Sequence, residues 1–274
     1  MLIDYHLHNR FSSDSKLKLE EIVAKEIKLG VSEICLTNHV ETFHPVTGEG
    51  IFVYEEAMTR FGKIKSDINE ARKQFPKFPI KFGVELEYLE PYMDDMKRFV
   101  EKMDFDFMIC SVHVVDEVVI SSSDLCGKLY EKVDEDYAYK KYFDLLLKAV
   151  EWGHFSVVGH FDICKKGGCK FYGPFRPEKY KNQIIPILNL MKKKDIGIEL
   201  NTRCLYDKCK ELFPHPDILK WAIDIGIENF TLGSDGHKIE EVGTGLNEAL
   251  AIAKDVGIKS ISTYKEGKPT AFQI

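Results

Sequence analysis

Six of the nine histidines in the 274-residue chain come just after short apolar runs that are typical of strands. These histidines are His6, His8, His39, His113, His160 and His237. Three carboxylates, Asp14, Glu85 and Asp235, occupy equivalent places. Imidazole is the commonest metal ligand, and one tetrahedral zinc takes only four ligands. The whole set therefore predicts two or three metal ions rather than one.

The spacing within two pairs supports this interpretation. His6 and His8 flank one residue of an extended segment, so both imidazoles point to the same side. Asp235 and His237 repeat that geometry. Taken singly, each histidine fits a hydrogen-bonded core residue as well as a ligand. The metal hypothesis rests on their recurrence at successive strand ends.

Closely spaced metal ions suit the hydrolysis of phosphate esters. They lower the pKa of a bound water and hold the attacking and leaving oxygens. A phosphoryl group mainly requires positioning and neutralisation of its charge. We therefore expect a hydroxide between two metals to attack phosphorus in line, without a covalent enzyme intermediate.

The elements that must position these residues alternate along the chain. Seven short runs rich in β-branched residues predict strands, and an eighth run, Lys259–Ser262, is a further candidate. The seven are Leu2–Tyr5, Ser32–Thr37, Ile80–Val84, Phe107–Ser111, Ser156–Val158, Ile196–Leu200 and Asn229–Gly233. Amphipathic helices are predicted between them, at Leu19–Leu29, Tyr54–Phe75, Tyr92–Met103, Asp136–Glu151, Pro177–Lys194, Pro216–Ile225 and Ile239–Asp255.

This alternation of strand and helix predicts an α/β fold with a parallel sheet. Single α/β barrels reach about 250 residues, and no Pro-, Gly- or Ser-rich linker divides the chain, so we expect one domain over residues 1–274. In such a barrel all strands open onto one face, where the candidate ligands would converge. Two long connections, Asn38–Val53 and Val114–Glu135, are expected to be lids or binding loops, although Ser121–Ser123 also fits a solvated connector.

Composition excludes several classes of protein. With 44 acidic and 38 basic residues the formal charge is −6, which argues against binding nucleic acid by bulk charge. Nowhere does the chain reach the roughly 18 consecutive apolar residues of a membrane span. Seven cysteines, an odd number, and a beginning without a basic and apolar export signal predict a reduced, cytoplasmic setting.

Several motifs resemble those of the polymerase and histidinol phosphatase (PHP) family of metal-dependent phosphoesterases, in the order and spacing of that family. They are Asp4–His8 with Ser13-Asp14, Leu36–His39, Gly83–Glu85, Cys110–His113, Gly159–Asp162 and Gly233–His237. The resemblance covers nearly the whole chain. It implies a distorted (β/α)7 TIM-like barrel that holds three divalent ions.

The resemblance also implies which residues hold each ion. His6, His8, Glu85 and Asp235 would hold the first, Glu85 with His113 and His160 the second, and Asp14, His39 and His237 the third. Glu85 would then bridge two ions. Some family members have His in place of Asp14. Nitrogen and oxygen ligands without thiolate admit zinc, manganese, iron or cobalt.

Further residues are candidates for catalysis or substrate binding. Arg203 follows the sixth strand, and its guanidinium suits a phosphate. Asp162 is either a proton-transfer or orienting group or a surface or capping residue, and His39 is a candidate for catalysis as well as ligation. Weaker candidates for substrate contact are Arg176, Lys165, His44 and Asn201, the last of which could instead orient ligands. Glu41 and Asp116 are candidates to contact an amine.

Two Cys-x4-Cys pairs lie after the fifth and sixth strands. Cys164 with Cys169 and Cys204 with Cys209 could form a four-thiolate zinc site, or be reduced loop cysteines.

The Gly159–Asp162 and Asn201–Arg203 segments resemble the stand-alone histidinol-phosphate phosphatases of the family. This implies a phosphomonoesterase for histidinol phosphate in histidine biosynthesis, with a small phosphorylated partner and no membrane or nucleic-acid partner. The alternatives are a PHP phosphoesterase for nucleotides or nucleic-acid ends, and a non-catalytic metal-binding module.

Overall fold

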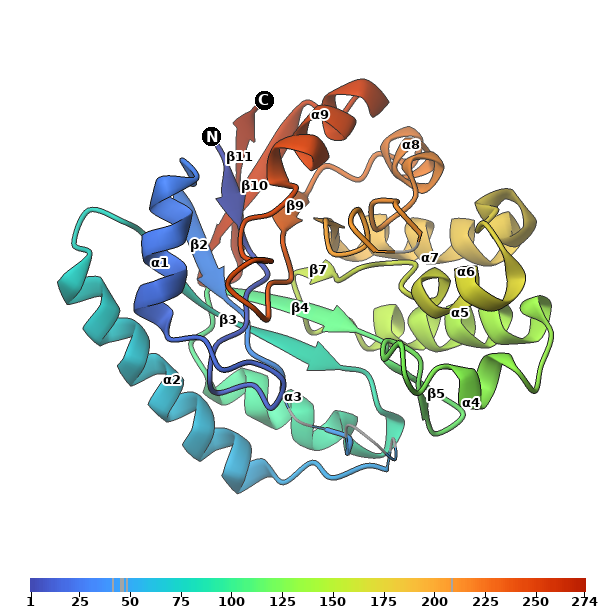
Figure 1. Ribbon diagram of the computed structural model, residues 1–274, viewed down its shortest axis with the longest axis horizontal. Coiled ribbons are helices and arrows are strands. Elements are labelled where there is room, and N and C mark those ends of the chain that lie inside the picture. Colours follow the sequence, from blue (N-terminus) through green and yellow to red (C-terminus); the bar gives the residue numbers. More distant parts are fainter. Residues whose placement is uncertain (41, 45–46, 48, 208) are drawn as a thin grey trace.

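Seven parallel strands form the sheet that carries the candidate ligands (Figure 1). The structure is a computed structural model that describes residues 1–40, 42–44, 47, 49–207 and 209–274. In spatial order they are β1 (Ile3–Asp4), β2 (Glu33–Leu36), β3 (Ile80–Glu87), β4 (Phe107–Ser111), β7 (Val157–Val158), β8 (Gly197–Asn201) and β9 (Phe230–Gly233). Their residues are almost all buried, as expected where both faces of a parallel sheet are covered. All seven predicted strands are confirmed.

The sheet curls until its last strand meets its first. The Tyr5 backbone N–H donates to the Leu232 carbonyl at 2.8 Å, and the Asp235 N–H donates to the His6 carbonyl at 2.8 Å. Leu7 and Gly236 form a parallel bridge one step further. The barrel is therefore nearly closed, and the predicted distorted TIM-like fold is confirmed.

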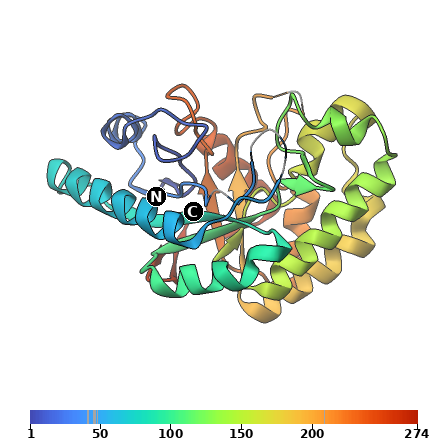
Figure 2. The ribbon, with the colours of Figure 1, turned by 90° about the horizontal axis from the view of Figure 1, so that it is seen from below.

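Helices cover the outside of the barrel between successive strands (Figures 1 and 2). They are α1 (Leu19–Lys28), α2 (Tyr54–Gln74), α3 (Met93–Lys102), α5 (Glu135–Trp152), α7 (Lys181–Lys194), α8 (Pro216–Ile225) and α9 (Leu246–Val256), with 3-10 turns η1 (Glu90–Tyr92) and η2 (Pro177–Tyr180) before α3 and α7. Local sequence explains several ends. Asp134 caps α5 by accepting from the Tyr137 N–H at 2.8 Å, and Gly153 ends the helix at a φ of 70°.

Two predicted segments differ from the structure. The eighth strand candidate becomes β10 (Ser260–Lys265), which pairs antiparallel with β11 (Lys268–Gln273) instead of joining the barrel. The last helix begins at Leu246 rather than Ile239, because the preceding turn contains Gly243 and Gly245 with positive φ values of 69° and 82°.

The segment after β7, where the sequence predicts a loop, contains a helix. This helix is α6 (Cys164–Tyr172), and two glycines in its middle weaken its helical signal. The long connection after β4 contains a small hairpin, β5 (Val114–Val115) with β6 (Val118–Val119), and a short helix, α4 (Gly127–Tyr130).

The β10–β11 hairpin lies against the end of the barrel where the strands begin. The Tyr264 N–H donates to the Tyr5 hydroxyl at 3.0 Å, and the Tyr264 ring packs on Phe107, the first residue of β4. The connections that leave the other ends of the strands gather on one side of the ribbon, at the top of Figure 2. None of the helices built from described residues combines the length and apolar character needed to cross a membrane.

Candidate metal centre

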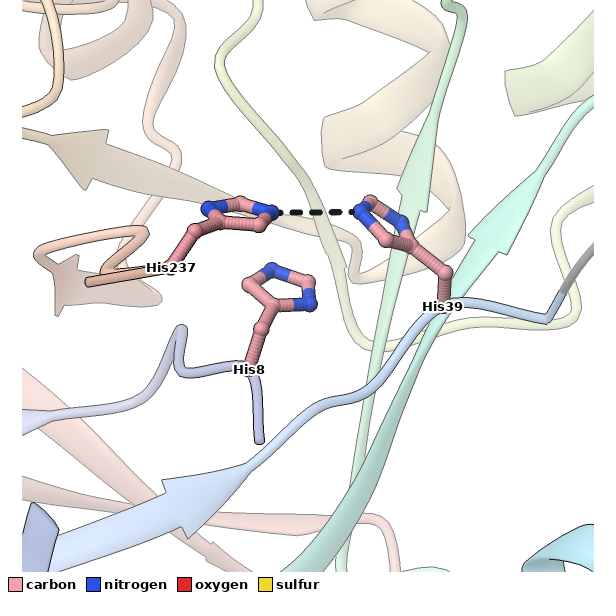
Figure 3. Close-up of side chains that lie close together, drawn as sticks. All are labelled: His8, His39 and His237. Carbon is pink, nitrogen blue, oxygen red and sulfur yellow. Dashed lines mark hydrogen bonds between the residues drawn. The ribbon is translucent and has the colours of Figure 1, made fainter. Parts of the chain in front are cut away.

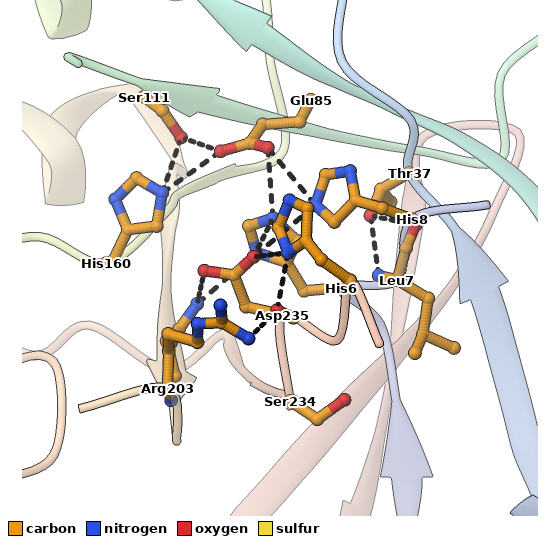
Figure 4. A network of polar contacts seen from close by, with 12 residues as sticks. His6, Leu7, His8, Thr37, Glu85, Ser111, His160, Arg203, Ser234 and Asp235 are labelled. Carbon is orange, nitrogen blue, oxygen red and sulfur yellow. Dashed lines mark hydrogen bonds and ion pairs between the residues drawn. The ribbon is translucent and has the colours of Figure 1, made fainter. Parts of the chain in front are cut away.

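Glu85, near the end of β3, lies at the centre of the predicted ligands (Figure 4). Its Oε2 lies 3.1 Å from His6 Nε2 and 3.5 Å from His8 Nε2. Its Oε1 lies 3.0 Å from His160 Nε2. Asp235 completes this part of the centre, with Oδ1 3.5 Å from His8 Nε2.

Two further imidazoles reach the same carboxylate. His113 Nε2 lies 3.4 Å from Glu85 Oε1 and 3.1 Å from His160 Nε2. His39 Nδ1 lies 2.8 Å from Glu85 Oε2. The structure thus brings the ligands predicted for the first two ions together around one shared side chain.

The residues predicted for a third ion also meet. Asp14 Oδ2 lies 3.0 Å from His237 Nε2 and 3.5 Å from His39 Nε2, and these two imidazole nitrogens are 3.4 Å apart. Figure 3 shows His39 and His237 turned toward each other, with His8 beside them. His39 therefore faces two parts of the centre through its two ring nitrogens.

The donor atoms of the centre fit a cation. His6 Nε2, His8 Nε2 and Glu85 Oε2 are buried, and their close contacts with one another and with His39 lack hydrogen-bond geometry, so none has a hydrogen-bond partner among the residues that the structure describes. A buried polar atom without a partner costs about 1–3 kcal/mol. A metal ion would satisfy all three atoms at once, and nitrogen and carboxylate donors are those that zinc, manganese and iron accept.

Charged neighbours shift the pKa values of these groups. Burial lowers the pKa of His6, but the Glu199 and Glu85 carboxylates outweigh it and raise that pKa well above its usual range. His39 shows the same balance, with Glu85 and Asp14 raising its pKa. Burial would raise the pKa of Glu85, yet His39 and His6 hold it well below its usual range. An imidazole must be neutral to bind a metal, so loading the centre releases these protons.

Two carboxylates behind the ligands were not identified from the sequence. Glu199 Oε1 lies 2.5 Å from His6 Nδ1, and Glu87 Oε2 lies 2.6 Å from His113 Nδ1. Each holds the far nitrogen of a ring, so that Nε2 faces the centre. Strand period was the available signal, because Glu87 lies two residues after Glu85 and shares its face.

A pocket of about 340 Å³ opens beside the centre. Ligand residues line it together with apolar, hydroxyl and basic side chains of the surrounding loops. Its lining is Ser13, Asp14, His39, Val40, Phe43, Glu87, His113, Val119, Ser121, Ser122, Ile163, Lys166, Arg203, Asp235, His237 and Lys238. Both long connections contribute, and Ser121 and Ser122 line the pocket.

Arg203 and Asn201 lie at the centre, in different roles. Arg203 lines the pocket, pairs with Glu241 and directs Nη1 to the Asp235 carbonyl at 3.4 Å. Asn201 is buried, and its Nδ2 donates to Glu199 Oε2 at 3.2 Å and Asp235 Oδ2 at 3.3 Å. Its position fits the orienting of ligands rather than contact with substrate.

Asp162 and Lys165 form a buried pair away from the pocket lining. Lys165 Nζ lies 3.0 Å from Asp162 Oδ2, 3.2 Å from Glu211 Oε2 and 2.7 Å from the Leu212 carbonyl, with no exposed surface. Three acceptors enclose the ammonium and Lys165 is not part of the pocket lining, so this residue is not placed for the predicted contact with substrate. Asp162 Oδ2 also accepts from the His215 N–H at 2.9 Å, which gives this residue a buried, structural position.

The remaining candidates lie outside the lining of this pocket. Arg176 is exposed just before η2, and His44 is exposed, with its ring accepting from the Thr47 N–H at 3.3 Å. Asp116 accepts from the Tyr137 hydroxyl at 2.8 Å. Glu41 lies outside the described residues. Lys166 and Lys238, by contrast, line the pocket and were missed, because nothing in their local sequence separates them from the many other lysines.

Comparison with known proteins gives a consistent picture. A probable histidinol-phosphatase of Clostridium acetobutylicum is 26% identical over 95% of this chain and 96% of its own length. A histidinol-phosphatase of Lactococcus lactis is 25% identical over 96% of this chain and 94% of its own length. The crystal structure of histidinol phosphate phosphatase from L. lactis, complexed with zinc, L-histidinol and phosphate, superposes with a TM-score of 0.82 at 23% identity and covers 98% of both chains. A putative histidinol phosphatase from Listeria monocytogenes gives 0.70 at 22% identity, over 90% of this chain and 99% of that one. The model of the PHP domain matches residues 4–203, and the chain therefore belongs to the PHP domain family.

Proposed function

We propose that this protein is a metal-dependent phosphomonoesterase that hydrolyses L-histidinol phosphate to L-histidinol and inorganic phosphate. The observation that carries the proposal is the set of imidazoles around Glu85, beside a pocket that also contains Arg203. Relatives named histidinol-phosphatase that match almost the whole chain support this substrate and do not favour nucleotides or nucleic-acid ends.

We infer three bound ions of zinc, manganese or iron, with Glu85 bridging two of them. Its two oxygens face different imidazoles, Oε2 toward His6 and Oε1 toward His160, which supports bridging. The third ion is supported by the contacts among Asp14, His39 and His237. When bound, such ions would supply an activated water and neutralise the charge of the phosphoryl group.

The residues of the chain itself would position the ester. Arg203 offers a guanidinium that can donate two parallel hydrogen bonds to phosphate oxygens, and Glu241 holds it at the edge of the pocket. Lys166 and Lys238 add positive charge to the same pocket. Phe43 offers apolar surface for the organic part of the substrate. A direct catalytic role of His39, beyond ligation, stays a prediction.

Steady-state kinetics with metal-loaded protein test this proposal. Phosphate release is measured from histidinol phosphate, phosphoserine, adenosine monophosphate and a single-stranded oligonucleotide with a terminal phosphate, with metal-stripped protein as the control. We expect kcat/KM for histidinol phosphate to exceed the others by about a hundredfold or more, because a site that hydrogen-bonds polar groups discriminates strongly. Comparable values would contradict the assigned substrate, and the absence of release from every ester would contradict the phosphatase itself.

A further inference from the structure

Cysteines from the two Cys-x4-Cys motifs meet outside the metal centre, but not as those motifs suggest. Cys209, in the connection after β8, places Sγ 3.1 Å from the Lys165 carbonyl and 3.7 Å from the Lys166 carbonyl. These carbonyls belong to the first turn of α6, one turn before Cys169. Cys169 and Cys209 also lie close enough for each thiol to shift the pKa of the other. The pair thus joins two segments that follow different strands.

A four-thiolate zinc site does not match this arrangement. Cys164 Sγ points instead toward the Asp162 carbonyl at 3.8 Å. Among the described residues, the groups of three or more side chains placed to hold one ion contain no cysteine. The structure places Cys169 beside Cys209, with Cys204 also next to Cys209, rather than four thiols around a centre.

The two thiols are more accessible than the cysteines near them, and they differ from each other in acidity. Cys169 and Cys209 are both half-buried, whereas Cys204, which contacts Cys209, is fully buried. The Cys209 thiol, more than any other cause, lowers the pKa of the Cys169 thiol, while the pKa of Cys209 is raised. Cys169 is therefore the thiol that ionises first, and the thiolate is the reactive form.

We propose that Cys169 and Cys209 form a reversible disulfide that ties α6 to the connection after β8. The oxidant is a small disulfide such as oxidised glutathione. The Cys169 thiolate attacks one of its sulfurs, forms a mixed disulfide and expels one glutathione thiolate. Cys209 then loses its proton to solvent, attacks the Cys169 sulfur and expels the second glutathione. Two protein thiols are oxidised, and one glutathione disulfide is reduced to two thiols.

The position of this disulfide links it to the pocket. The connection after β8 begins at Thr202 and contains Arg203 near its start. Near its far end, Glu211 and Leu212 already contact Lys165 of α6. The disulfide adds a covalent tie beside these contacts. We therefore expect oxidation to restrict this connection and protect it from proteolysis.

Mass spectrometry of the metal-loaded full chain tests the proposal. The protein is equilibrated in glutathione buffers of increasing oxidation, alkylated and digested. We expect the loss of two hydrogen atoms, a peptide that joins Cys169 to Cys209, and its disappearance on re-reduction. Cys169→Ser and Cys209→Ser should abolish the joined peptide, whereas Cys164→Ala, on the same helix but turned away, should retain it.

Three results would overturn the proposal. They are alkylation of both thiols at every buffer ratio, glutathione attached to Cys169 without the joined peptide, and a joined peptide that contains Cys204 instead. Because the wild-type digest decides between them, the test holds even where a variant folds poorly.

Discussion

The side chains around Glu85 have two kinds of position. Some are placed to bind a metal ion, and others orient the side chains that would bind it. Glu85 faces imidazoles with both oxygens, with Oε1 near His113 and His160 and Oε2 near His6 and His39. Behind His6 and His113, Glu199 and Glu87 contact the far ring nitrogen, so they set the direction and basicity of these two rings. This division predicts different losses for substitutions at the two positions.

Replacing Glu199 with Gln should weaken metal binding by about 10- to 100-fold, the usual effect of losing an outer partner. Glu199 contacts His6 Nδ1 at 2.5 Å, and its other oxygen accepts from the His160 N–H at 2.8 Å. Competition with a chromogenic chelator measures the change. Glu101→Gln, exposed on α3, is the matched control and should leave affinity unchanged. Wild-type affinity in E199Q would show that the ring needs no such partner.

Replacing Arg203 with Ala should raise KM for the phosphate ester, and the inhibition constant of inorganic phosphate, by about 10- to 100-fold. A hydrogen bond to a charged group contributes about 1.5–3 kcal/mol, and Arg203 is the guanidinium that lines the pocket. Arg98→Ala is the control, since Arg98 is exposed and pairs with Asp95 at 2.8 Å. Unchanged phosphate inhibition in R203A would exclude Arg203 from phosphate binding.

At the scale of elements, the barrel strands set the direction of each functional side chain. β3 pairs with β2 over Ile80–Phe82 and with β4 over Gly83–Glu87, and its alternate residues direct Glu85 and Glu87 into the centre. Packing of helices on the strands adds a second group of buried carboxyls. Glu26 on α1 lies beside Asp4 in β1, and both residues are fully buried.

The raised pKa of the Glu26 carboxyl should make the free energy of unfolding depend on pH. Burial, reinforced by Asp4, raises the pKa of Glu26 to about 10. Because this folded-state pKa exceeds the unfolded value of about 4.3, the stability that Glu26 contributes is complete below about pH 4.3 and is lost as the pH rises toward 10.

Glu26→Gln cannot ionise and should avoid this loss. The free energy of unfolding of E26Q relative to wild type should therefore rise with pH, as measured by urea unfolding at about pH 6 and about pH 9. Glu70→Gln, exposed on α2, should show no such trend. Parallel pH curves for E26Q and wild type would contradict the assignment of a neutral Glu26.

Across the whole molecule, barrel closure explains what the sequence could and could not predict. Asp235 after β9 meets His6 after β1 because the last strand bonds to the first, and a parallel barrel gathers all its strand ends at one face. The convergence of the candidate ligands was therefore predictable from their places after the strands. Glu199 was not, since a buried Glu on a strand has no distinguishing neighbour in sequence.

Side chains whose direction depends on tertiary packing were also beyond prediction. Lys165 lies after β7 as expected, but its position on α6 directs its ammonium toward Asp162 and Glu211 instead of the pocket. Cys209 lies near Cys204 of its own motif and also near Cys169 of the other motif. The second contact arises because the connection after β8 lies on α6. Spacing along the chain carries no information about such contacts between segments.

Stepwise metal loading tests the central claim most directly. Metal-stripped protein is titrated with zinc, manganese or iron, and phosphate release from histidinol phosphate is measured on the same samples as the bound metal per chain. We predict no release from stripped protein, and a rate that rises with loading to a maximum at about three ions per chain, the number proposed above. Full hydrolysis without metal, or none in the fully loaded protein, would contradict the account.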